Sequence, residues 1–160
     1  MSAFASFLFS HNTRIALLVF CLGVALCVPS TLLTMYNGMA VGAFVALHES
    51  KGLLLDITAW LSIHGVTELS AIVVACAGGY HLGQAVLFPG ELRRRDALRR
   101  NARDAVKLAI LAAIMLVAAA LLEAFGRQWV QDIPTRLTIG LGVGALWILW
   151  LGLCGRGRAR

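Results

Sequence analysis

Charged residues are scarce in this chain of 160 residues, in which Asp, Glu, Lys and Arg make up 14% and hydrophobic residues 59%. An ordinary soluble domain carries about 25% charged residues. More than half of the chain lies in four runs without any of these charges: 15–47, 69–90, 108–122 and 137–155. A soluble fold of this size cannot bury so much apolar length, whereas crossing a bilayer takes about 20 apolar residues. The composition excludes a soluble enzyme, a disulfide scaffold and a disordered chain, and it predicts a polytopic membrane protein.

Sequence motifs of common catalytic and metal sites are also missing. The chain holds no HExxH, GxSxG, P-loop or GxGxxG motif. Its four cysteines form no CxxC pair and no metal-finger spacing, so that buried thiols are the simplest interpretation: Cys21, Cys27, Cys76 and Cys154. We therefore expect no metal, no cofactor and no enzymatic activity. No signal-peptide pattern is present either, and we expect membrane entry to depend on the spans themselves or on sequence upstream.

The apolar runs predict an all-α bundle of about five membrane-spanning helices. The expected spans are, in chain order, 13–28, 30–48, 64–88, 104–125 and 136–154. The first two form a hairpin that turns near Pro29, because proline breaks a helix. The apolar segment 53–63 is too short to cross a bilayer, and it predicts a short interfacial or re-entrant helix.

Basic residues indicate the orientation of the bundle. The interval 91–107 holds seven Arg and Lys residues against three acidic ones, and such clusters in short loops mark the cytoplasmic side. We expect a cytoplasmic loop at about 90–103 and a basic cytoplasmic tail at 156–160. The transmembrane domain then covers 13–155, after an external interfacial segment at 1–12. The side chains expected to contact anionic lipid headgroups, rather than nucleic acid, are Arg93, Arg94, Arg95, Arg99 and Arg100.

Ionisable residues inside the expected spans are the candidates for a site, because each costs about 2.5–3.5 kcal/mol at a helix centre in the bilayer. His64 and Glu68 lie four residues apart and share one helix face. Glu123 is expected at the same depth, in the outer half of the next span. Three interpretations of this intramembrane polar cluster stay open: helix-locking polar groups, a path for protons, ions or solutes, and metal or hydrolytic chemistry. Asn37 and His81, both expected in the inner half, are minor candidates that more often bond between helices.

Small residues recur at intervals of four in three of the spans. They are Gly38 with Gly42, then Ala71, Ala75, Gly79 and Gly83, and last Gly140 with Gly144. Such stripes let helix backbones approach closely, so that van der Waals contacts replace the missing hydrophobic drive. The pattern predicts a compact bundle, and a homo-oligomer is compatible with it.

Four segments with polar residues carry a resemblance to a known family. They are Ser-His-Asn-Thr-Arg at 10–14, Tyr-Asn-Gly-Met-Ala-Val-Gly at 36–42, His-Gly-Val-Thr-Glu-Leu-Ser-Ala-Ile at 64–72 and Leu-Glu-Ala-Phe at 122–125. Together they resemble the stage II sporulation protein M (SpoIIM) family over about 10–155. The family often has Asn-Asn where this chain has His11-Asn12. Its members tend to carry a further span before the first one here, so we expect the chain to match the C-terminal part of a longer pattern.

The resemblance implies a multi-pass inner-membrane protein of bacteria. In spore formers the family member anchors or scaffolds two peptidoglycan-degrading partners, and no catalytic residue carries over from it. We therefore expect a non-enzymatic component or scaffold of a cell-envelope complex, whose partners are membrane lipids and other membrane or envelope proteins. The alternative is a transporter or channel subunit that uses the intramembrane carboxylates.

Overall fold

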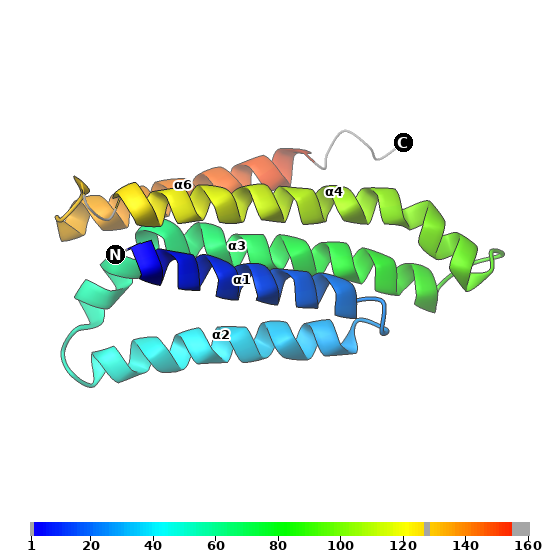
Figure 1. The fold of residues 1–160 in the computed structure, drawn as a ribbon, viewed down its shortest axis with the longest axis horizontal. Coiled ribbons are helices and arrows are strands. Elements are labelled where there is room, and N and C mark those ends of the chain that lie inside the picture. Colours follow the sequence, from blue (N-terminus) through cyan, green and yellow to red (C-terminus); the bar gives the residue numbers. More distant parts are fainter. Residues whose placement is uncertain (1, 127–128, 155–160) are drawn as a thin grey trace.

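The computed structural model describes residues 2–126 and 129–154, and within these ranges every long element is a helix (Figure 1). The elements are α1 (Ser2–Leu22), α2 (Val28–Glu49), α3 (Leu54–Leu87), α4 (Arg94–Leu121), the π-helical turn η1 (Leu122–Gly126) and α6 (Ile133–Cys154). The predicted all-α fold is confirmed. The predicted basic tail at 156–160 lies outside the described residues.

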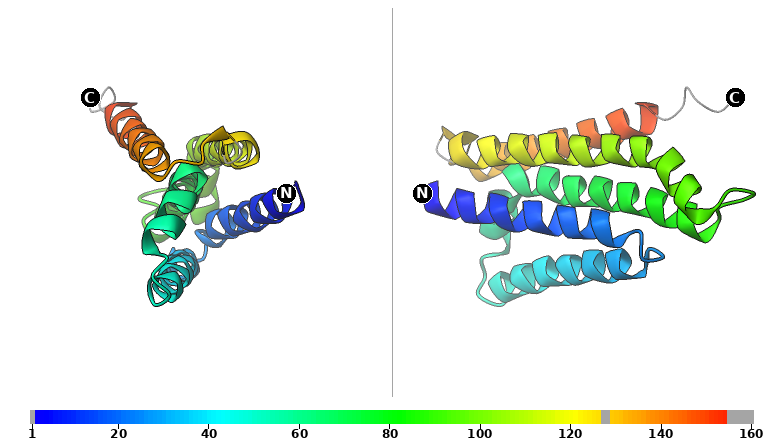
Figure 2. Two further views of the ribbon diagram at one scale, coloured as in Figure 1. Left: turned by 90° about the vertical axis from the view of Figure 1, so that its left-hand side faces the viewer. Right: turned by 45° about the vertical axis from the view of Figure 1, so that its right-hand side comes forward.

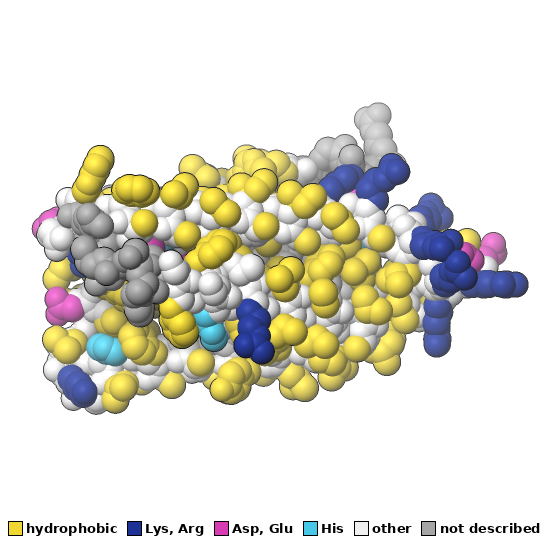
Figure 3. All heavy atoms as spheres, in the orientation of Figure 1, with side chains coloured by type: hydrophobic (Ala, Val, Ile, Leu, Met, Phe, Trp, Pro, Cys, Tyr) yellow, Lys and Arg dark blue, Asp and Glu magenta, His cyan; other side chains and the backbone are white. Residues whose placement is uncertain are grey.

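Most of the described helices are long and apolar enough to cross a membrane. Four meet this description: α2, α3, the stretch Arg94–Gly126 and α6. The apolar part of α1 in the described chain, Ser6–Leu22, is shorter. On the face drawn in Figure 3, apolar side chains cover the length of the bundle, and Lys and Arg side chains gather at one end. The outside of the bundle therefore suits a hydrocarbon environment.

Helix α3 is the central element of the bundle. It contacts α1, α2, α4 and α6, and the end-on view of Figure 2 has these four helices arranged around it. Successive helices run in alternating directions, so the turns 23–27 and 88–93 lie at the same end (Figure 1). We call this the arginine end, because it includes the exposed side chains of Arg93, Arg94, Arg95, Arg99 and Arg100. The opposite end holds the turn 50–53 and the start of α6.

The segment 53–63 is not a separate interfacial helix, as the sequence predicted, but forms the first turns of α3. The 34 residues of α3 are continuous, and at 1.5 Å per residue they extend about 51 Å, beyond the roughly 30 Å of a hydrocarbon core. Ile57, Ala59 and Ile63 are buried within these first turns. Because the segment packs against the bundle, its apolar residues do not need the membrane interface.

Two further boundaries differ from those predicted. The basic interval at about 90–103 is a loop only up to Arg93, because its Arg, Ala and Leu residues are good helix formers and continue into α4. Helix α1 begins at Ser2 and runs without a break to Leu22, so it joins the expected interfacial segment to the first span. Pro29 lies in the first turn of α2, where proline is tolerated, and the chain turns just before it.

Glycines let the α1–α2 hairpin pack directly onto α3. A Cβ atom at Gly79 would lie 2.6 Å from the carbonyl oxygen of Val19, so the two backbones are in contact there. In the same stripe Ala71 and Ala75 are buried, and Gly83 faces the α1–α2 turn. Helix α6 approaches α3 in the same way, at Gly140 beside Ser62 and Gly144 beside Val66. A Cβ at Gly38 or Gly42 of α2, by contrast, would meet nothing within 4 Å.

Asp132 caps the start of α6. Its Oδ2 accepts a hydrogen bond of 2.6 Å from the Thr135 hydroxyl and one of 3.0 Å from the Thr135 backbone N–H. These two bonds stabilise the charged carboxylate and lower the pKa of Asp132 below its ordinary value. The cap satisfies one of the N–H groups that every helix start leaves without a partner.

We expect Asp132→Ala to lower the melting temperature of the protein in detergent, measured by circular dichroism at pH 7, because this cap is lost. Asp132→Asn keeps an acceptor oxygen and should melt within a degree or two of the unchanged protein. The pKa of Asp132 is lowered in the fold, so its contribution is present above the unfolded value of about 3.9 and lost as the pH falls through the folded value. Equal melting of the Ala and Asn variants at pH 7 would contradict the cap.

Candidate functional site

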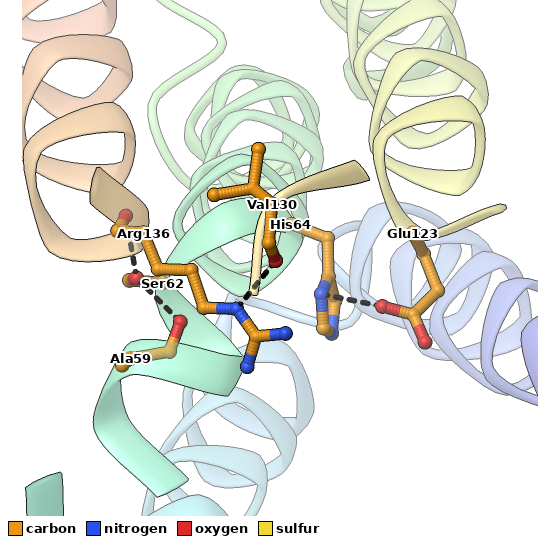
Figure 4. A network of polar contacts seen from close by, with 6 residues as sticks. All are labelled: Ala59, Ser62, His64, Glu123, Val130 and Arg136. Atoms are coloured by element: carbon orange, nitrogen blue, oxygen red, sulfur yellow. Dashed lines mark hydrogen bonds and ion pairs between the residues drawn. The ribbon is translucent and has the colours of Figure 1, made fainter. Parts of the chain in front are cut away.

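A buried pair of ionisable residues joins α3 to the end of α4. Nδ1 of His64 lies 2.7 Å from Oε2 of Glu123, and both side chains are almost fully buried (Figure 4). Glu123 belongs to the π-helical turn η1, a rare geometry that is often found at functional sites. The ring of Trp60 packs edge-on against the His64 ring at 5.2 Å. The pair is either imidazolium with carboxylate or imidazole with carboxylic acid, two forms that differ in the position of one proton.

Polar links tie α6 to α3 next to this pair. The Ser62 hydroxyl donates to the Arg136 carbonyl at 3.0 Å, and Arg136 Nε donates to the Val130 carbonyl at 2.9 Å (Figure 4). Further along α6, the indole N–H of Trp147 donates to the Thr67 hydroxyl at 3.2 Å. The Ser62 and Trp147 bonds hold α6 against α3 on both sides of His64, and the Arg136 bond ties α6 to the turn before it.

Glu68 lies one turn after His64 and faces a cavity between α1, α2 and α3. The Glu68 side chain is buried, and it accepts a side-chain hydrogen bond from Asn12 of α1. The cavity has a volume of about 330 Å³, and Glu68 and Asn12 line it together with His11 and Asn37. The other lining residues are mostly apolar, among them Leu8, Val41, Phe44, Leu61 and Leu69. Polar groups from three helices thus meet inside an otherwise apolar space.

The predicted cluster thus divides into two neighbouring sites. His64 pairs with Glu123, while Glu68, on the same helix, contacts Asn12. Asn37, which the sequence predicted in the inner half, lines the same cavity as Glu68.

His81 lies apart, in a pocket near the arginine end with Gln84 and Asp104. The buried core between Glu68 and His81 is apolar and includes Ile72, Ala75 and Met115. Beside this core, the hydroxyls of Thr31 and Thr34 on α2 are bonded to Tyr80 and Cys76 of α3.

The sequence prediction missed the two polar α1 residues of the cavity. Asn12 and His11 fell in the segment expected at the membrane interface, because the first span was begun at residue 13. A signal was present, since both belong to the Ser-His-Asn-Thr-Arg segment of the family resemblance. Among the described residues, no group of three or more His, Cys, Asp and Glu side chains is arranged to hold a metal ion.

Comparison with known proteins gives two matches. A sequence profile of the family described as Stage II sporulation protein M matches residues 1–126. An uncharacterized protein of Methanocaldococcus jannaschii is 22% identical over 118 residues, which are 72% of this chain and 66% of that protein. The chain thus spans slightly less than two thirds of the length of this relative. No solved structure matches the chain. The residues matched by the profile include the His64–Glu123 pair and every residue that lines the cavity.

Proposed function

The chain belongs to the stage II sporulation protein M family, and from this premise we propose that it is a non-enzymatic scaffold of a bacterial cell-envelope complex. It crosses the inner membrane several times, with its arginine end and C-terminus in the cytoplasm. The exposed arginines of that end support this orientation, because basic residues near short loops favour the cytoplasmic side. They also bind anionic lipid headgroups there. Its partners in this role are other membrane or envelope proteins.

The observation that carries the proposal is an arginine on the outer surface of α1. The Arg14 side chain is exposed, and it lies eight residues, or about 12 Å, before the end of α1 at Leu22. This distance is longer than an arginine side chain can reach. One turn later on the helix the exposed side chains are the apolar Leu17 and Leu18, and one turn earlier they are the polar Ser10 and His11. Neither ion pair between described residues includes Arg14. A partner helix with a carboxylate at this depth removes the cost of leaving the charge in lipid.

The interior polar groups support a scaffold better than a conductor. His64 with Glu123 and Glu68 with Asn12 are bonded between helices, which stabilises one arrangement of the bundle. The core between Glu68 and His81 includes the apolar Ile72, Ala75 and Met115, and the hydroxyls of Thr31 and Thr34 beside it are already bonded to Tyr80 and Cys76. Reconstituted liposomes should therefore show no proton or cation flux above protein-free vesicles, and a flux would favour the conducting alternative.

Reversing the charge of Arg14 tests the scaffold directly. We expect Arg14→Glu to reduce the amount of envelope proteins cross-linked to the chain in intact cells by about tenfold, because two carboxylates then face each other at the interface. Cross-linked partners are quantified by mass spectrometry after purification of the tagged protein.

The matched control is Arg14→Lys, which keeps the positive charge and should keep most of the cross-linked partners. Both variants should accumulate in the membrane to the same level, since Arg14 is exposed and belongs to neither ion pair between described residues. Capture of the same partners in the same amounts by Arg14→Glu would overturn the role of this surface.

A further inference from the structure

The cavity between α1, α2 and α3 exists because the hairpin is fixed at one end only. At the arginine end, Gly79 and Gly83 bring the α1–α2 turn onto α3, and the Ser30 hydroxyl bonds the Val19 carbonyl. Towards the opposite end α2 runs away from α1 (Figure 1). The walls there include the small residues Ala40 and Gly65, which leave room. The resulting volume of about 330 Å³ is within the usual range of ligand sites, about 300–1,000 Å³.

The polar end of this cavity is rich in hydrogen-bond acceptors. A carboxylate can only accept, so Asn12 must present its NH₂ group to Glu68, and its carbonyl oxygen remains an acceptor. Asn37 adds a second amide from α2. The lining includes no Lys or Arg; His11 lines the cavity and His64 lies one turn from Glu68, but neither ion pair between described residues includes Glu68. The site therefore suits a ligand that brings donors and a positive charge.

The apolar part of the cavity restricts the class of ligand further. The rings of Trp60 and Phe44 line the same space, and aromatic faces attract a cation within about 6 Å. Val41, Leu61 and Leu69 offer contact to a hydrocarbon arm. A small hydrated metal ion would leave these walls unused, whereas an amphiphile uses both parts.

We propose that this cavity binds an alkylammonium group. The ammonium donates its N–H groups to Glu68, Asn12 and Asn37, and its hydrocarbon arm lies along the apolar walls. The group belongs either to a free alkylamine or to the headgroup of an aminolipid, and both present the same chemistry. The site goes beyond the scaffold role and does not depend on it, because its residues differ from the Arg14 surface.

The test is binding of decylamine to the purified protein in dodecyl maltoside micelles, followed by Trp fluorescence and by the rise in melting temperature. Decanol partitions into the same micelles without the charge, and it should bind at least tenfold more weakly. Glu68→Gln keeps the side-chain size and should weaken decylamine binding at least tenfold. Ala40→Leu fills the cavity and should do the same, whereas Ala43→Leu, on α2 outside the cavity lining, should bind as the unchanged protein does.

The source of the ammonium is decided in nanodiscs. Phosphatidylethanolamine carries an ammonium with N–H groups, whereas the ammonium of phosphatidylcholine has none. If an aminolipid headgroup is the occupant, phosphatidylethanolamine competes for the cavity, and decylamine binds more weakly in nanodiscs of this lipid than in nanodiscs of phosphatidylcholine. Equal decylamine binding in both lipids supports a free alkylamine. Equal decylamine affinity of the unchanged protein and the folded Ala40→Leu variant, or decanol binding as tight as decylamine binding, would overturn the proposal. Circular dichroism and size-exclusion elution establish that each variant is folded.

Discussion

Gly79→Leu should leave little folded, monodisperse protein in detergent. A Cβ at this position would lie 2.6 Å from the Val19 carbonyl oxygen and 2.8 Å from that of Phe20. Both are backbone atoms that cannot rotate aside, so α1 must move away from α3. Overpacking of a core costs about 1–3 kcal/mol where side chains can adjust, and more where they cannot. That loss is a large part of a total stability of about 5–15 kcal/mol.

Size-exclusion elution and the melting temperature measure the effect of this substitution. The matched control is Gly38→Leu in the middle of α2, where a Cβ would meet nothing within 4 Å. This control should elute as the unchanged protein does and melt at or above its temperature, because glycine is a poor helix former. If Gly79→Leu also elutes and melts normally, α1 and α3 do not approach each other through their backbones.

Glu123→Leu should lower the free energy of unfolding by about 3–5 kcal/mol, because it removes one partner of a buried pair and leaves the other without its counter-charge. Oε2 of Glu123 lies 2.7 Å from Nδ1 of His64, and both side chains are almost fully buried. His64→Leu should be similarly harmful, since it leaves a buried carboxyl. The measurement is unfolding in mixed micelles with increasing sodium dodecyl sulfate, followed by circular dichroism.

The double variant distinguishes the loss of the His64–Glu123 interaction from the general effect of substituting buried residues. Replacing a buried ion pair by apolar residues on both sides is often neutral or stabilising. The combined His64→Leu and Glu123→Leu protein should therefore be more stable than either single variant. Strictly additive losses would show that the two side chains do not interact.

The fold class follows from the distribution of charge along the chain, and so does most of the helix order. The exact helix limits do not follow, because they depend on packing. The segment 53–63, which contains Asp56, is too short to cross a bilayer by itself. Its residues Ala59 and Ile63 are nevertheless buried, because the segment forms the first turns of the longer helix α3. Asn12 falls in the predicted interfacial segment 1–12, just before the first predicted span. No local property of the chain reveals that its partner will be Glu68 on another helix.

The site was predictable in part, by residue spacing and by matching of depth. His64 and Glu68 share a face because they are four residues apart, and antiparallel helices bring Glu123 to the level of His64. The division into a bonded pair and a separate cavity was not predictable. It depends on the π-helical turn at Leu122–Gly126 and on how α1 and α2 pack on α3, where the backbones of α1 and α3 meet at Gly79.

The central position of α3 also bears on biosynthesis. Helix α1 leaves the ribosome before α3, so it carries Asn12 and Arg14 while Glu68, which will bond Asn12, is still untranslated. Both side chains oppose transfer from the translocon into lipid. The α1–α2 hairpin therefore has to wait beside the translocon, or beside an insertase, until Glu68 and the glycines of α3 emerge. Stable insertion of α1 thus follows the synthesis of α3.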